Sequence, residues 1–105
     1  MMRITCVSPA AIFFGEKLIS FDHDQDCCED NYADFKQIDR EALTTDFPED
    51  LTFETVPGLG FRFGYPGRMF FIPCYSEQNG YYSSDLDIYY CGKKVCYVTC
   101  KEVIC

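Results

Sequence analysis

The chain lacks the excess of basic residues that nucleic-acid-binding proteins use to hold phosphates. It has nine Lys and Arg residues against seventeen Asp and Glu, for a net charge of −8. We therefore expect no direct binding to nucleic acid. Thirteen of the acids lie in residues 1–55, so an acidic face would instead suit a basic partner or mimic nucleic acid. The simpler interpretation is that these acids keep a small protein soluble.

Long apolar runs are also missing. No run approaches the length of a membrane span, and we expect no membrane partner. Near the N-terminus, Glu16 and Lys17 follow soon after Phe13 and Phe14, which argues against a secretory leader. Eight cysteines would predict disulfides in a secreted protein. Without a leader, we expect a protein of the cytoplasm, in the bacterial host cytosol, with mostly reduced thiols.

Motifs that mark common enzyme classes are absent as well. The chain has a single His and no phosphate-binding loop, no dinucleotide-binding fingerprint and no G-x-S-x-G nucleophile motif. No pair of cysteines has the C-x2-C spacing of common zinc sites. We therefore expect no enzymatic activity, no catalytic residue and no cofactor.

What the chain does contain is typical of one small β-rich domain covering residues 1–105. Hydrophobic residues make up 48%, and aromatic residues reach 17% without any Trp. Gly15 predicts a tight hairpin between two apolar runs, and Asn79-Gly80 is the strongest hairpin signal in the chain. Alternating or apolar runs bounded by turn residues predict strands over 3–8, 11–14, 18–21, 51–56, 61–65, 68–76, 81–90 and 96–101.

One segment predicts a helix. Tyr32, Phe35, Ile38 and Ala42 recur at helical spacing, and Asp26 with Glu29 has the spacing of a capping box. The expected fold class is therefore α+β. We predict a bent antiparallel sheet or small partly open barrel, with one main helix (about 29–43) packed on it.

The stretch from His23 to Asp30 is the densest in potential ligands. His23, Cys27 and Cys28 are weak metal candidates, because H-x3-C-C is not a standard zinc spacing. Alternate acids at 22, 24 and 26 resemble the start of a calcium loop, but Cys27 stands where that loop needs Gly. A thiol at a helix N-terminus would be activated as a nucleophile, yet no third orienting group is identifiable.

A second block, residues 76–83, surrounds the Asn79-Gly80 turn. If the two blocks meet, they form a polar cleft at one end of the sheet. The binding residues that we predict there are His23, Asp24, Gln25, Asp26, Glu29, Asp30, Gln78, Asn79, Tyr81 and Tyr82. On the polar face of the later strands, Tyr81, Tyr89 and Tyr97 predict either a contact platform or cross-strand pairs.

Together these blocks resemble an uncharacterised family of small phage and prophage proteins. In that family a strand ends in His-x-Gln-Asp-Cys-Cys-Glu, and a later hairpin has roughly the pattern Ser-x-Asn-Gly-Tyr-Tyr-Ser. Here the blocks are residues 23–29 and 76–83, while residues 47–75 and the Cys-rich tail 91–105 depart from the pattern. The resemblance implies a phage-type origin and a shared core, and no activity.

These observations give three hypotheses. The first is a non-enzymatic, phage-type protein that inhibits a host defence protein through its acidic surface. The second is capture of a nucleotide-like molecule or a metal in the cleft between residues 23–29 and 76–83. The third is an enzyme that uses Cys27 or Cys28. A homodimer through edge strands is possible in each case.

Overall fold

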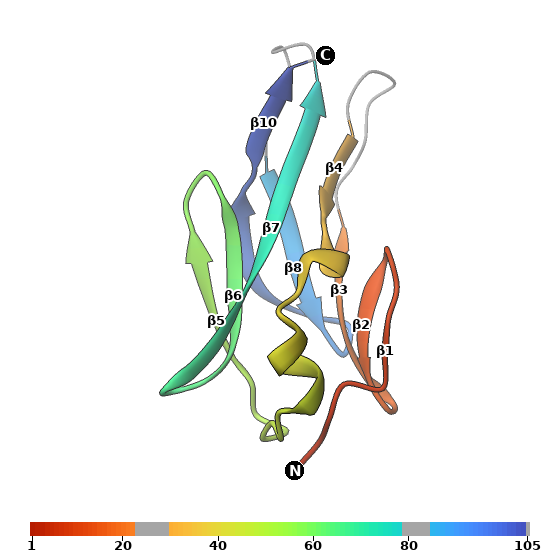
Figure 1. Ribbon diagram of the computed structural model, residues 1–105. Helices are drawn as coiled ribbons and strands as arrows, with labels where there is room; N and C mark the ends of the chain where they lie inside the picture. Colours follow the sequence, from red (N-terminus) through yellow and green to blue (C-terminus); the bar gives the residue numbers. More distant parts are fainter. Residues whose placement is uncertain (23–29, 79–84, 105) are drawn as a thin grey trace.

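The computed structural model describes residues 1–22, 30–78 and 85–104, which form mainly β-strands arranged as two sheets (Figure 1). The first sheet has the order β1-β2-β3-β8-β9, and every pairing in it is antiparallel. Its strands are β1 (Cys6–Val7), β2 (Ala11–Phe14), β3 (Lys17–Asp22), β8 (Asp85–Tyr90) and β9 (Lys93–Thr99).

The second sheet is built around one long strand, β7 (Arg68–Gln78). Its remaining strands are β4 (Asp30–Ala33), β5 (Thr52–Val56), β6 (Gly60–Tyr65) and β10 (Lys101–Ile104). The first half of β7 pairs with β6. The second half pairs with β4 in antiparallel fashion and with β10 in parallel fashion. Because β4 and β10 pair with the same residues, Tyr75–Glu77, they occupy opposite edges of β7.

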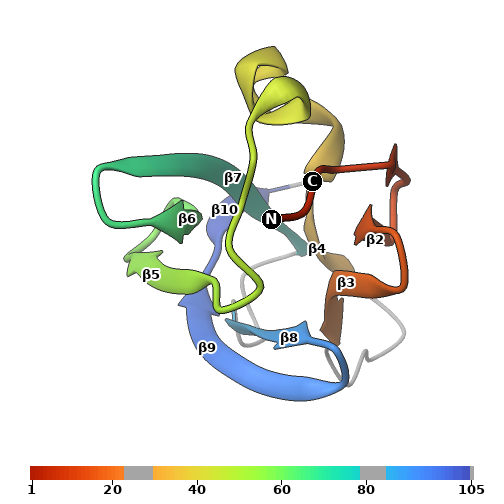
Figure 2. The same cartoon turned by 90° about the horizontal axis from the view of Figure 1, so that it is seen from below.

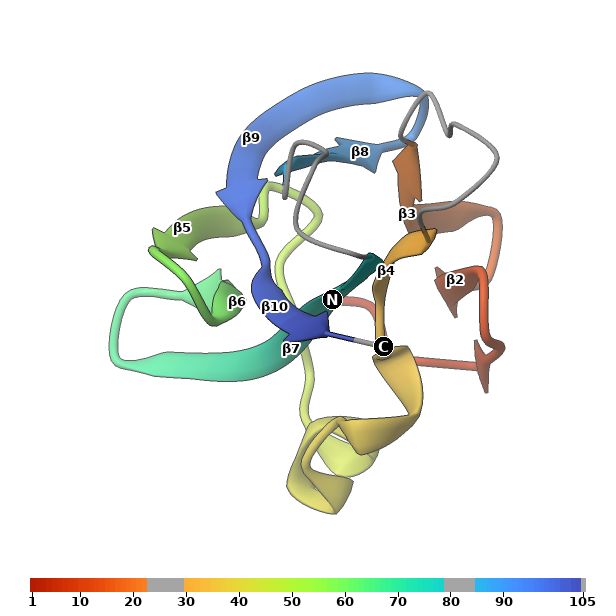
Figure 3. The same cartoon turned by 90° about the horizontal axis from the view of Figure 1, so that it is seen from above.

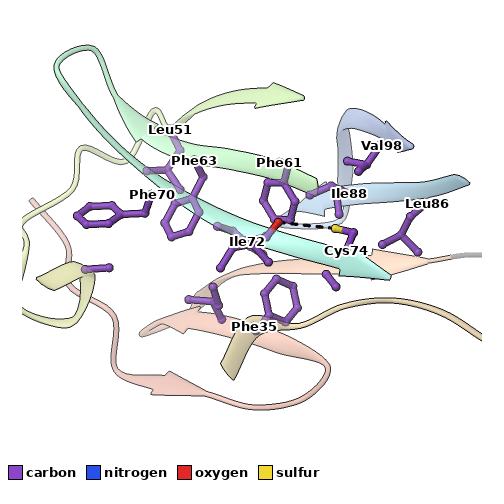
Figure 4. Close-up of a cluster of buried hydrophobic side chains, with 14 of the residues drawn as sticks. Phe35, Leu51, Phe61, Phe63, Phe70, Ile72, Cys74, Leu86, Ile88 and Val98 are labelled. Carbon is purple, nitrogen blue, oxygen red and sulfur yellow. Dashed lines mark hydrogen bonds between the residues drawn. The ribbon is translucent and has the colours of Figure 1, made fainter. Parts of the chain in front are cut away.

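The two sheets face each other and enclose one hydrophobic core. Views along the long axis show β5 beside β9 on one flank and β4 beside β3 on the other (Figures 2 and 3). The alternation that predicted these strands also supplies the core: Leu86 and Ile88 in β8 and Val98 in β9 are buried. Figure 4 shows these side chains meeting those of β6 and β7.

Aromatic side chains dominate one part of this core. The ring of Phe47, on the segment before β5, packs edge-on against Phe14 of β2 and Phe70 of β7. Its centroid also lies 5.6 Å from that of Phe63 in β6. Because one ring contacts residues of both sheets, burial of Phe47 fixes the distance between the sheets. Backbone hydrogen bonds from Phe47 to Met2 add the N-terminus to this arrangement.

The predicted helix over about 29–43 is wrong, and with it the α+β class, because the described residues are nearly all β. The segment instead forms β4, followed by two short 3-10 turns, η1 (Phe35–Gln37) and η2 (Arg40–Thr44). Two of the four spaced positions, Phe35 and Ala42, are still fully buried, whereas Tyr32 and Ile38 are half-buried. A spacing of three or four residues between apolar positions fits an α-helix. It also fits a strand followed by 3-10 turns, because a 3-10 helix has three residues per turn.

The two hairpin predictions have different outcomes. β2 and β3 pair across Gly15 as expected, with Phe14 opposite Lys17. Residues 79–80 lie outside the described residues, but the strands that flank them belong to different sheets. β7 pairs with β4, β6 and β10, whereas β8 pairs with β3 and β9. Over the described residues, β7 and β8 therefore do not pair with each other as the two arms of a hairpin would.

Candidate functional site

The strands that lead into and out of both motif blocks end on the same side of the molecule (Figure 1). Asp22 at the end of β3 pairs with Asp87 of β8, and Asp30 at the start of β4 pairs with Glu77 of β7. The chain enters and leaves residues 23–29 and 79–84 from these strands. The fold thus brings the two flanking regions together, although about fifty residues separate them in sequence.

Most of the predicted binding residues lie outside the described part of the chain. This applies to His23, Asp24, Gln25, Asp26, Glu29, Asn79, Tyr81 and Tyr82, and to the metal candidates Cys27 and Cys28. Of the predicted set, the backbone of Asp30 and Gln78 is described, as the first residue of β4 and the last of β7. Gln78 pairs with Ile104 of β10, so the C-terminal strand also reaches this end.

A buried polar contact joins the two sheets directly beneath these strand ends. Asn31 of β4 and Ser76 of β7 are both fully buried and form a cross-strand pair. The Ser76 hydroxyl donates to Oδ1 of Asn31, and Nδ2 of Asn31 donates to the carbonyl oxygen of Asp85 at 2.9 Å. Asp85 is the first residue of β8 in the other sheet. Asn31 therefore fixes the position of the start of β8 relative to β4 and β7.

Acidic and tyrosine side chains share the outer face of the first sheet at this end. Opposite residues of an antiparallel pair point to the same face. Asp22, Asp87 and Tyr97 therefore form a row across β3, β8 and β9, because Asp87 pairs with both of the others. Asp85 lies two positions before Asp87 and so projects from the same face of β8.

Local contacts determine the electrostatics of this face. The Tyr97 hydroxyl donates a hydrogen bond of 2.7 Å to Oδ2 of Asp85, and this contact raises the pKa of the tyrosine. Lys94 forms an ion pair with Asp87, with 3.0 Å between Nζ and Oδ1, and lies 5.5 Å from the ring centroid of Tyr97. Tyr97 remains 52% exposed, so its ring is open to a partner.

The second sheet presents a related arrangement nearby. Tyr32 of β4 and Tyr75 of β7 are opposite residues with ring centroids 5.8 Å apart. The hydroxyl of Tyr32 lies 3.5 Å from a carboxylate oxygen of Glu77. The sequence pointed to Tyr81 and Tyr82, and it gave no signal for Tyr32 or Tyr75. The segment of Tyr32 was predicted as helix, with Tyr32 on the face that packs against the sheet, whereas Tyr75 lies in the strand predicted over 68–76.

We call the positions Asp22, Asp30, Glu77, Asp85 and Asp87 the acidic end. The two stretches that contain them, residues 22–30 and 76–87, hold eight of the seventeen acids and no Lys or Arg. Exposed ion pairs form elsewhere, such as those of Arg3 with Asp46 and of Arg68 with Glu41. Among the described residues, the five acids of the acidic end therefore lie together at one end of the two sheets.

Two surface hollows lie away from the acidic end. The larger, of about 440 Å³, is lined by Met2, Phe14, Glu16, Lys17, Glu49 and Cys91. The smaller, of about 290 Å³, is lined by Val7, Lys36, Ile38, Arg40 and Leu43. Neither includes a described residue of the cleft that the sequence predicted. Over residues 1–22, 30–78 and 85–104, no group of three His, Cys, Asp or Glu side chains is placed to hold a metal ion.

Searches with this chain against protein-family models, curated proteins and solved structures give no match. Among the residues that the structure describes, no helix is long and apolar enough to cross a membrane.

Proposed function

We propose that this chain is a non-enzymatic binding protein, of a phage type, that occupies a basic surface of a host protein through its acidic end. The observation that carries the proposal is the pairing of Asp22 with Asp87 and of Asp30 with Glu77. Acidic residues placed opposite each other in a sheet destabilise it. A protein that nevertheless places two such pairs at one end has an arrangement suited to a positively charged partner.

Three further features support binding to a protein rather than catalysis. The face is built on strands and is held by the buried contact of Asn31, so its charges are preorganised. Tyr97, 52% exposed, provides the kind of side chain that is enriched in protein interfaces. The clustered negative charge would speed the encounter with a basic partner. Inhibition of a host defence protein by imitation of nucleic acid is the form that we favour.

The proposal is tested by affinity capture from a bacterial host lysate, with three baits compared side by side. The first bait is the natural chain, the second carries Asp22→Asn and Asp85→Asn, and the control carries Asp50→Asn. Asp50 is exposed and lies near Tyr90, at the opposite end of β8 from Asp85. We expect a basic host protein to be retained by the natural chain and the control. The double variant should retain at least tenfold less of it.

Salt provides the second criterion, because screening weakens contacts between exposed charges. The captured protein should be released from the bait as ionic strength rises. If the chain imitates nucleic acid, adding the natural chain should also displace nucleic acid that is bound to the captured protein. If all three baits retain the same proteins to the same extent, the acidic end is not the binding surface. An excess mass in the native mass spectrum, absent after denaturation, would instead favour capture of a small molecule or metal.

A further inference from the structure

Two cysteines that are distant in sequence lie side by side in the core. In the parallel pairing of β10 with β7, Lys101 is opposite Tyr75 and Glu102 is opposite Ser76. The same register places Cys100, which precedes Lys101, beside Cys74, which precedes Tyr75. Both side chains are buried, with 3% and 0% of their surface exposed. Both are free thiols in the structure.

The spacing of these backbones suits a disulfide. Neighbouring strands lie about 4.8 Å apart. Bridged cysteines have Cα atoms roughly 4.4–6.8 Å apart, so neighbouring positions on paired strands are within reach of a disulfide. The thiols also interact: hydrogen bonding to Cys100, together with burial, raises the pKa of Cys74. The Cys74 thiol is 3.9 Å from the carbonyl oxygen of Ile72, the contact drawn in Figure 4.

We propose that Cys74 and Cys100 form an intramolecular disulfide when the protein meets a small disulfide oxidant such as oxidised glutathione. One cysteine thiolate attacks the oxidant, forms a mixed disulfide and releases one glutathione thiolate. The second cysteine then attacks the protein sulfur of that mixed disulfide and releases the second glutathione. The two cysteine protons end on the two glutathione thiols, so two protein thiols are oxidised while one glutathione disulfide is reduced.

This bond would fasten the C-terminal strand. Within the described residues, β10 has β7 as its only strand partner. The disulfide would close the segment from residue 74 to residue 100 and so restrict the unfolded chain. It would also hold β10 against Tyr75–Gln78, the part of β7 that carries Ser76 and Glu77. Oxidation therefore rigidifies the end of β7 that carries Glu77, one of the five residues of the acidic end.

Burial sets the rate of the reaction. A protonated thiol is a poor nucleophile, and the raised pKa keeps Cys74 protonated at neutral pH. Oxidation then requires β10 to separate locally from β7, its one strand partner among the described residues. The exposed Cys6 and Cys91 should react with glutathione first, and the buried pair should follow more slowly.

The test is a peptide map of the natural chain after incubation with oxidised glutathione. Remaining thiols are alkylated, and the protein is digested without reduction. We expect a cross-linked peptide containing residues 74 and 100, with a loss of 2 Da relative to the two free thiols. Cross-linking should raise Tm by about 10 °C over that of the reduced protein. Adding a reducing agent should reverse the shift.

The proposal is overturned if, in the fully oxidised sample, residues 74 and 100 both carry the alkylating group. It is equally overturned if either cysteine is found mainly in a bond to another one. Cys6→Ala serves as the matched control and should retain the cross-link and the shift in Tm. Cys100→Ala should lose both, and the map of the natural chain decides the question even if that variant does not fold.

Discussion

At the scale of single residues, Asn31 is the side chain on which the architecture of the acidic end depends. It is fully buried, and its amide contacts a hydroxyl in β7 and a backbone carbonyl in β8. A buried amide with satisfied hydrogen bonds specifies one arrangement of its neighbours, because any other arrangement leaves polar groups without partners. Asn31 thus links the packing of the two sheets to the position of the acidic strand ends.

Replacing this amide tests its role directly. Asn31→Ala removes both hydrogen bonds and leaves a small cavity, so we expect the free energy of unfolding to fall by about 2–3 kcal/mol. Urea denaturation measures the change. Gln37→Ala is the control, since Gln37 is exposed and bonds to Asp34 and Tyr75 at the surface. Its loss should cost less than about 1 kcal/mol.

Ser76→Ala completes a double-mutant cycle with Asn31→Ala. If the two side chains act as a pair, the second substitution should cost less in the variant that already lacks Asn31. Strictly additive losses would contradict the coupling that we infer from their contact.

At the scale of elements, the sequence was most informative where side chains alternate over a long run. The inward positions of β8 and β9 followed from that alternation, as did the hairpin at Gly15. The segment over residues 30–44 was predicted incorrectly because a spacing of three or four residues fits an α-helix and a strand followed by 3-10 turns equally well. Burial of Asn31 against Ser76 favours the strand, and that contact depends on a residue forty-five positions away.

The pairing of β6 with β7 depends on a close approach of two backbones at Gly64. A Cβ atom added there would lie 2.2 Å from the carbonyl oxygen of Arg68, and the residue has φ of +149°. Gly64→Ala should therefore lower the free energy of unfolding by roughly 3 kcal/mol or more. Thermal denaturation followed by circular dichroism measures the loss.

Gly67 provides the matched control, because it also has a positive φ, of +95°, but no atom lies within 4 Å of an added Cβ. Gly67→Ala should cost only about 1–2 kcal/mol, the strain of its backbone. Equal losses in the two variants would mean that backbone conformation, and not the approach of β7, explains the need for glycine.

At the scale of the whole molecule, the important property is where the net charge of −8 lies. The fold places Asp22 opposite Asp87, so we expect Asp22→Asn to raise the free energy of unfolding by about 0.2–1 kcal/mol. The gain should shrink as salt screens the repulsion. Urea denaturation at low and high ionic strength measures both effects.

Glu54→Gln serves as the comparison in which an attractive pair is removed. Glu54 in β5 is opposite Arg62 in β6 and forms an ion pair with it. That substitution should lower stability slightly, by up to about 1 kcal/mol, and again less at high salt. A loss of stability in Asp22→Asn would show that the acidic end is not under electrostatic strain.

The sequence by itself determined the features that depend on neighbouring residues. These are the faces of the alternating strands, the Gly15 hairpin and the presence of two acidic stretches without bases. Only the tertiary structure decided which strands pair, and therefore that β7 and β8 belong to different sheets and that Cys74 lies beside Cys100. Periodicity is a local property of the chain, whereas strand pairing is selected by the burial of all apolar faces at once. The acidic end exists because that selection places Asp22 opposite Asp87 and Asp30 opposite Glu77.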